Sequence, residues 1–200
     1  MEARSPFEEM REEHIALLTD VAGLKDSIRR LAQPDIGTPG MGNVTRDELE
    51  LFGRRLRVHF RREEEGLFPD AQRMVSEGAH GADVFGRFFA EEAEDDMTAH
   101  VTLTRRANEM LEIAAQMQEA GGPDESSARR LLALVNLTAS LLERHAAKED
   151  TLIFPMIAKS LTPDKVEAMR QRLQTLGSDR DLTSSDQDES GMSQLGTAGQ

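Results

Sequence analysis

Two short segments of the chain repeat the same chemistry-bearing residues at the same spacing. His59 and Glu63 are four residues apart and precede the triplet Leu-Phe-Pro. Residues 145–155 place a His, a Glu, an aliphatic residue, a Phe and a Pro at the same offsets. A His and a Glu at positions i and i+4 lie on one face of a helix, so each pair can reach one ion or two adjacent ions. Each segment is therefore a candidate metal clamp.

A single offset of 86 residues relates most of the histidines. It separates His14 from His100, His59 from His145, and the glutamate of the first segment from that of the second. This regularity indicates a duplicated helix pair, in which each copy directs one His from its first helix, and one His plus one Glu from its second, towards the core. The candidate metal ligands are His14, His59, Glu63, His100, His145 and Glu149.

The residue types restrict the chemistry of such a site. The chain has no Cys and no Tyr, which excludes thiolate and phenolate ligands. A single His on an apolar helix face is more often a core residue than a ligand, but the shared offset argues against that interpretation for all four. Two unpaired carboxylates in a helical core would each cost several kcal/mol without a cation. Imidazole and carboxylate ligands without sulfur suit iron, manganese or zinc.

The elements that must position these residues are helices. Apolar residues recur at helical spacing, and no long stretch alternates as a strand would. Ser5 and Glu8 predict a capping box that opens the first helix, and Thr45 and Glu48 predict another that opens the second. Pro- and Gly-rich stretches predict the loops. We expect a helix over residues 6–31 and a second from 45 to about 69. A third should carry the apolar stripe from 85 to 110 and end at the Gly- and Pro-containing stretch 120–127, and a fourth should carry the stripe from 131 to 152 and run into Phe154-Pro155. A short fifth helix should extend from about 163 to 176.

This pattern predicts an all-α fold. We expect an antiparallel up-down four-helix bundle with an internal pseudo-twofold repeat and a short fifth helix, forming one domain over residues 1–177. Residues 178–200 are rich in Ser, Asp, Gln and Gly. Because few apolar residues are available there to offset the entropy of ordering, we expect a disordered acidic and polar tail.

Charge and hydropathy exclude several kinds of partner. The net charge of −13 and the pI near 4.9 argue against binding to nucleic acid or to an anionic membrane. No apolar run approaches the roughly 18 to 20 residues that span a bilayer, and the N-terminal sequence lacks a signal pattern. We therefore expect a soluble cytoplasmic protein. The sequence does not identify a protein partner.

The motifs resemble those of one known family. His14, the segment HFRREEEGLFP, His100 and the segment HAAKEDTLIFP match the pattern of the hemerythrin-like (HHE cation-binding) di-iron bundles over about residues 6–161. Ferritin-like proteins differ, because they use Glu-x-x-His. The resemblance implies two irons, rather than manganese or zinc, joined by an oxo or hydroxo group and by Glu63 and Glu149. It implies His14, His59, His100 and His145 as terminal ligands.

One family position differs in this chain. Oxygen-carrying members place two histidines at i and i+4 on the third helix, whereas Asp96 lies four residues before His100. With about six ligands per metal, about one position on each metal would stay open. Asp96 or the loop residue His80 could close one of them. The acidic run around Asp96 reads most simply as a solvated face, and we expect Glu64, Asp150, Arg61 and Arg62 at the surface.

The resemblance implies a protein that binds O2, nitric oxide or peroxide for sensing, carriage or redox handling. Closure of one metal by Asp96 or His80 would favour reversible binding, and two open metals would favour turnover. The alternatives are a di-iron enzyme that disproportionates peroxide, oxidises ferrous iron or reduces nitric oxide, an iron storage or repair protein, and a purely structural bundle. The sequence leaves open whether the protein is an enzyme.

Overall fold

The computed structural model describes residues 4–31, 41–76 and 82–177. Within these ranges the chain is helical apart from short connections, and no strand occurs among them, which confirms the all-α prediction. His80 and residues 178–200 lie outside the described residues, so the predictions for that histidine and for the acidic tail stay predictions.

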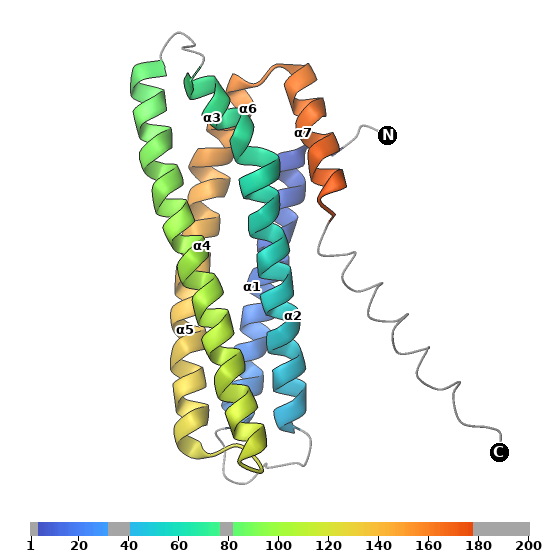
Figure 1. The fold of residues 1–200 in the computed structure, drawn as a ribbon, viewed down its shortest axis with the longest axis vertical. Coiled ribbons are helices and arrows are strands. Elements are labelled where there is room, and N and C mark those ends of the chain that lie inside the picture. The colour runs from blue at the N-terminus through green and yellow to red at the C-terminus, as the bar shows by residue number, and fades with distance from the viewer. Residues whose placement is uncertain (1–3, 32–40, 77–81, 178–200) are drawn as a thin grey trace, which may run out of the picture.

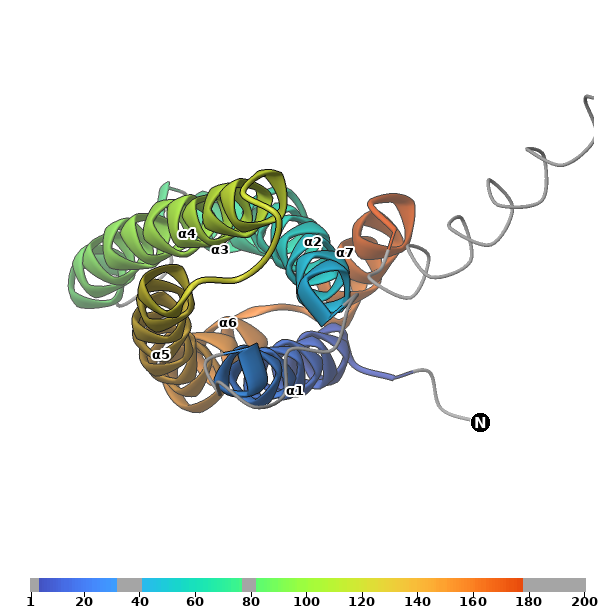
Figure 2. The same ribbon diagram turned by 90° about the horizontal axis from the view of Figure 1, so that it is seen from below.

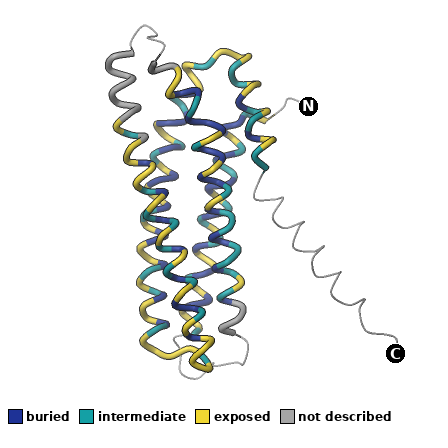
Figure 3. Tube along the Cα trace, viewed as in Figure 1, coloured by how far each residue is buried: buried dark blue, intermediate teal, exposed yellow. Residues whose placement is uncertain are grey.

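Four long helices lie side by side. They are α1 (Pro6–Leu31), α2 (Met41–Arg61), α4 (Ala82–Glu119) and α5 (Glu125–Lys148). Successive helices run in opposite directions (Figure 1), and the end view in Figure 2 shows them around a shared centre. Helix α1 packs on α2 and α5, and α4 packs on the same two helices. The faces that meet in the middle carry the buried residues (Figure 3).

Shorter elements gather at one end of the long helices. Helix α2 passes through a π-helical turn, η1 (Arg62–Leu67), into α3 (Phe68–Ser76). Helix α5 passes through a second π-helical turn, η2 (Glu149–Ile153), into α6 (Phe154–Ser160). Helix α7 (Pro163–Thr175) then packs against η1 and α1.

Two apolar clusters occupy the interior. The main cluster fills the long helices and includes Leu17, Phe52, Leu56, Leu103 and Leu142. The end cluster joins α1 to the short elements and includes Phe7, Met10, Leu67, Phe154 and Leu173. Along α1, Met10 belongs to the end cluster and Leu17 to the main cluster, so the buried His14 lies between them. The predicted ligands therefore lie in a polar layer between two water-excluding layers.

Most predicted helix ends agree with the structure. The backbone N–H of Ser5 donates to Glu8 at 3.0 Å, as a capping box requires, and α1 begins at Pro6. Gly177 has φ +76° just after α7, which explains a glycine at that stop. The predicted start of the second helix at Thr45 is wrong, because α2 begins at Met41 and buries Thr45 within it. A Thr side chain can also bond inside a helix, so the capping-box pattern permits a start without requiring one.

Gly66 allows α7 to approach η1 closely. A Cβ at this position would collide with the fully buried Leu173 and lie 3.2 Å from Leu176 Cδ1, while Arg172 Nη2 donates to the Gly66 carbonyl at 3.0 Å.

We predict that Gly66→Ala lowers the free energy of unfolding by about 1–3 kcal/mol through overpacking, measured by urea denaturation. Gly23→Ala is the control, because its Cβ would meet nothing within 4 Å and should be neutral or stabilising. Equal effects at the two positions would contradict this packing account.

Candidate metal centre

The two π-helical turns hold the predicted glutamate ligands. Phe68 N–H donates to the carbonyl of Glu63, and Phe154 N–H donates to that of Glu149, each five residues back. The prolines that follow each Phe have no N–H, and in a regular α-helix the ring would collide with the carbonyl four residues earlier. A wider turn before each proline relieves that collision, and such turns occur often at functional sites. The repeated Phe-Pro thus shapes the backbone that presents each glutamate.

The structure brings all six predicted ligands into one buried cluster. The side chains come from α1, α2, η1, α4, α5 and η2, and each is at most 3% exposed. Glu63 Oε1 lies 3.1 Å from His59 Nε2, and Glu63 Oε2 lies 3.1 Å from His100 Nε2. Glu149 Oε2 lies 3.0 Å from His14 Nε2 and 3.4 Å from His145 Nε2. Each glutamate therefore connects histidines of two different helices.

The inward-facing atoms of this cluster have no hydrogen-bond partner in the described part of the chain. They are the Nε2 atoms of His14, His59, His100 and His145 and both carboxylate oxygens of Glu63 and Glu149. Ligand atoms lie within 4.8 Å of one another in two overlapping sets, one of His14, His59, Glu63, His145 and Glu149, and the other of Asp96, His100, His145 and Glu149. Unsatisfied buried donors and acceptors are costly. This arrangement could hold a metal ion, and its nitrogen and oxygen atoms fit iron, manganese or zinc.

Each histidine is held from behind by a carboxylate. The Nδ1 contacts are His14 with Asp150 at 3.0 Å, His59 with Glu13 at 3.0 Å, His100 with Glu64 at 2.7 Å and His145 with Asp96 at 3.2 Å. A carboxylate acceptor keeps the ring proton on Nδ1 and leaves the Nε2 lone pair free to face inward. Carboxylate–histidine pairs of this kind orient metal ligands and raise their basicity. All four rings are thus arranged as metal ligands would be.

Four surface predictions need correction. Glu64 and Asp150, expected to point away, accept these bonds from His100 and His14 and are only about one-third exposed. Asp96 is 1% exposed, so the solvated-face interpretation is wrong. Arg62 is fully buried, because it pairs with acidic residues of α1. The sequence did carry a signal for the first two, since Glu64 and Asp150 each follow a predicted ligand glutamate and are themselves 86 residues apart.

Asp96 has a second role available to it. Its Oδ1 accepts the bond from His145, while its Oδ2 has no partner among the described residues. The Asp96 carboxylate also belongs to the second set of converging ligand atoms, with His100 and Glu149. Asp96 is therefore a candidate further ligand, as the sequence left open.

Without a cation, the cluster retains protons. Burial opposes the charged form of His14, but its hydrogen bond to Asp150 and its contacts with Glu149 and Glu63 outweigh burial and raise the pKa of His14 from 6.5 to about 11. Burial and repulsion from Glu63 raise the pKa of Glu149 well above its usual range. Burial also acts to raise the pKa of Glu63, yet the neighbouring histidines lower it overall. Metal binding must therefore release protons.

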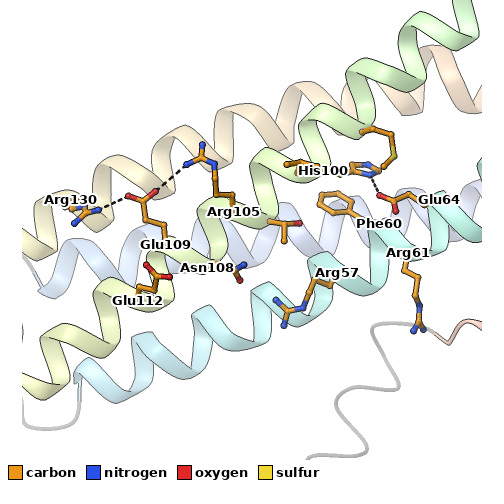
Figure 4. Close-up of a pocket in the computed structure, with 13 residues that line it drawn as sticks. Arg57, Phe60, Arg61, Glu64, His100, Arg105, Asn108, Glu109, Glu112 and Arg130 are labelled. Carbon is orange, nitrogen blue, oxygen red and sulfur yellow. Dashed lines mark hydrogen bonds and ion pairs between the residues drawn. The ribbon is translucent and has the colours of Figure 1, made fainter.

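An open groove leads from the surface to this cluster. It has a volume of about 920 Å³, lies between α2 and α4, and reaches Phe60, Glu64, Met97, His100 and Val101. Figure 4 shows Phe60 beside His100 and the bond between His100 and Glu64. The rings of Phe60 and His100 stack with centroids 3.9 Å apart. His100 is therefore the predicted ligand nearest to this groove, with Phe60 as its cover.

Comparison with the models of known protein families found no match for the chain, and neither did comparison with curated proteins. Among the described helices, none combines the length and apolar character needed to cross a bilayer.

The proton retained on His14 predicts a pH-dependent stability of the metal-free protein. Because the folded pKa of about 11 exceeds 6.5, His14 stabilises the fold below pH 6.5 and loses this contribution as the pH rises towards 11. We expect the free energy of unfolding, measured with urea across this range, to fall more steeply in the wild type than in His14→Gln. Parallel pH profiles would contradict this assignment of the proton.

Proposed function

We propose that this chain is a hemerythrin-like protein: an antiparallel four-helix bundle with pseudo-twofold symmetry that holds two irons and binds O2, nitric oxide or peroxide. One observation carries the proposal. A duplicated helix pair directs four Nε2 atoms and four carboxylate oxygens into one buried layer, where they lack hydrogen-bond partners. In a purely structural bundle, the desolvation free energy of these buried groups would have no compensating interaction.

The two glutamates are suited to connect two metal ions. Glu63 directs Oε1 to His59 and Oε2 to His100, which belong to different copies of the repeat. Glu149 lies beside His14 and His145, again one from each copy. His14, His59, His100 and His145 would then be the terminal ligands. When bound, a pair of irons would supply reversible electron transfer to small oxygen and nitrogen ligands.

The surrounding residues favour a small ligand. The main and end apolar clusters exclude water on both sides of the polar layer. The groove between α2 and α4 offers an approach to the cluster, but the ring of Phe60, stacked on His100, covers that histidine. Diatomic molecules and peroxide fit this restriction better than a large organic substrate does.

Asp96 favours ligand binding over turnover. Its carboxylate belongs to one of the two ligand sets and its Oδ2 makes no hydrogen bond within the described residues, whereas Glu13, which supports His59 from α1, belongs to neither set. Closure of one metal by Asp96 would make the two metals different, which suits a carrier or sensor. A di-iron enzyme that consumes peroxide or oxidises ferrous iron is the alternative.

The metal content and spectrum of the protein test this proposal. We expect about two irons per chain by plasma emission, and a visible absorption that changes reversibly when the reduced protein meets O2 or nitric oxide. Glu63→Gln should lower iron affinity by at least about 10-fold, because loss of an anionic ligand should cost no less than loss of a partner that only orients a ligand, typically about 10–100-fold. Glu65→Gln is the matched control, because Glu65 is exposed in the same π-helical turn.

The other outcomes separate the alternatives. Two irons with rapid peroxide consumption and no stable O2 adduct would favour the enzyme. A colourless protein that takes up no iron after anaerobic reconstitution would rule out the di-iron centre.

A further inference from the structure

A chain of ion pairs lies behind His59 and is buried at Glu13 and Arg62. Glu13 Oε2 lies 3.0 Å from His59 Nδ1, and Glu13 Oε1 forms an ion pair with Arg62. The other end of the same guanidinium lies 2.6 Å from Glu9 Oε1. Arg62 is fully buried and Glu13 is 5% exposed. We refer to Glu9, Glu13 and Arg62 as the arginine unit.

A similar chain lies behind His145. Asp96 Oδ1 lies 3.2 Å from His145 Nδ1 and 3.6 Å from Lys148 Nζ. The same ammonium is 2.7 Å from Glu92 Oε2 and donates to the Glu92 carbonyl at 3.2 Å. We refer to Glu92, Asp96 and Lys148 as the lysine unit.

The two units occupy equivalent places in the repeat. Arg62 and Lys148 are 86 residues apart, and each immediately precedes a ligand glutamate. Each unit has two carboxylates and one cation, so both carry the same net charge of −1 when ionised. A difference between them must therefore come from burial and from how firmly each carboxylate is held.

The arginine unit holds its carboxylate more firmly. The guanidinium of Arg62 is planar, keeps its charge and contacts Glu9 and Glu13 together. Both oxygens of Glu13 are thus in ion-pair contact, Oε2 with His59 and Oε1 with Arg62.

The lysine unit is looser, and its cation is more exposed than Arg62. Lys148 is 24% exposed in its side chain and lies nearer to Glu92 than to Asp96. Asp96 Oδ2 makes no hydrogen bond within the described residues, and the Asp96 carboxylate belongs to the second set of ligand atoms. Asp96 can therefore turn from His145 towards the cluster at the loss of only a 3.6 Å contact with Lys148, whereas Glu13 would have to break its closer pair with Arg62.

We propose that these units make the two metal positions unequal: the ion held through His59 binds first and tightly, and the ion held through His145 binds second and exchanges. This inference rests on the proposed two-metal centre. Arg62 and Lys148 act as positioning residues through the carboxylates that orient the two histidines. Partners that orient metal ligands typically change metal affinity by about 10–100-fold.

Release of Co²⁺ to a chelator tests the inference without any activity assay. The metal-free full chain is loaded with Co²⁺, and the loss of its visible absorption is followed after addition of excess EDTA. We expect two phases of equal amplitude, one at least about 10-fold faster than the other. Lys148→Arg should slow the fast phase by about 10-fold, because a guanidinium can bridge Glu92 and Asp96. Arg62→Lys should accelerate the slow phase by a similar factor.

Two exposed positions supply matched controls. Lys159→Arg and Arg129→Lys make the same exchanges on the surface and should leave both phases unchanged. Lys148→Arg decides the matter even if Arg62→Lys fails to fold, because slower release is a gain that a damaged fold cannot produce.

The outcomes distinguish the inference from the function beneath it. Two bound ions released at one common rate, a fast phase unaffected by Lys148→Arg, or a fast phase that responds to Arg62→Lys instead would overturn the inference and leave the two-metal centre in place. A protein that binds no Co²⁺ would overturn both.

Discussion

The burial of two carboxylates and four imidazoles between apolar layers is the constraint on which the structure depends. Glu63 and Glu149 are fully buried, and their oxygens face histidine nitrogens without completing hydrogen bonds. Charges removed from water are costly unless paired, and protons on His14 and Glu149 relieve only part of that cost. A cation bound at this place would pair these charges, so the same groups would stabilise the fold instead of destabilising it.

The backbone and the outer carboxylates are both adapted to that layer. Each glutamate begins or lies within a π-helical turn that precedes a proline, so its direction differs from that in a regular helix. Each histidine has a carboxylate at Nδ1, so its Nε2 faces inward. The apolar clusters on both sides then strengthen every electrostatic interaction in the layer by excluding water. The backbone turns, the inward-facing residues and the carboxylates behind the histidines therefore all direct polar atoms into the same buried layer.

The repeat is symmetric in its six inward-facing residues and asymmetric further out. Gly66 in η1 admits α7, whereas Leu152 stands at the corresponding place in η2 and is partly exposed. Arg62 is buried, whereas Lys148, at the corresponding position of the second copy, is partly exposed to solvent. Glu13 and Asp96 serve equivalent histidines, yet they are 83 rather than 86 residues apart, a difference close to one helical turn. The shared spacing thus extends to the centre of the cluster, and the differences between its halves lie in the residues around it.

The sequence by itself determined the helical class and the six inward residues, because helical periodicity and the 86-residue offset are properties of spacing alone. The same 86-residue offset also relates Glu64 to Asp150 and Arg62 to Lys148. Only the tertiary structure decided that Glu13 and Asp96 support His59 and His145, that Arg62 is buried and that the turns at Glu63 and Glu149 are π-helical. Those features depend on the register between packed helices, and a long side chain can reach its partner from more than one position along the neighbouring helix.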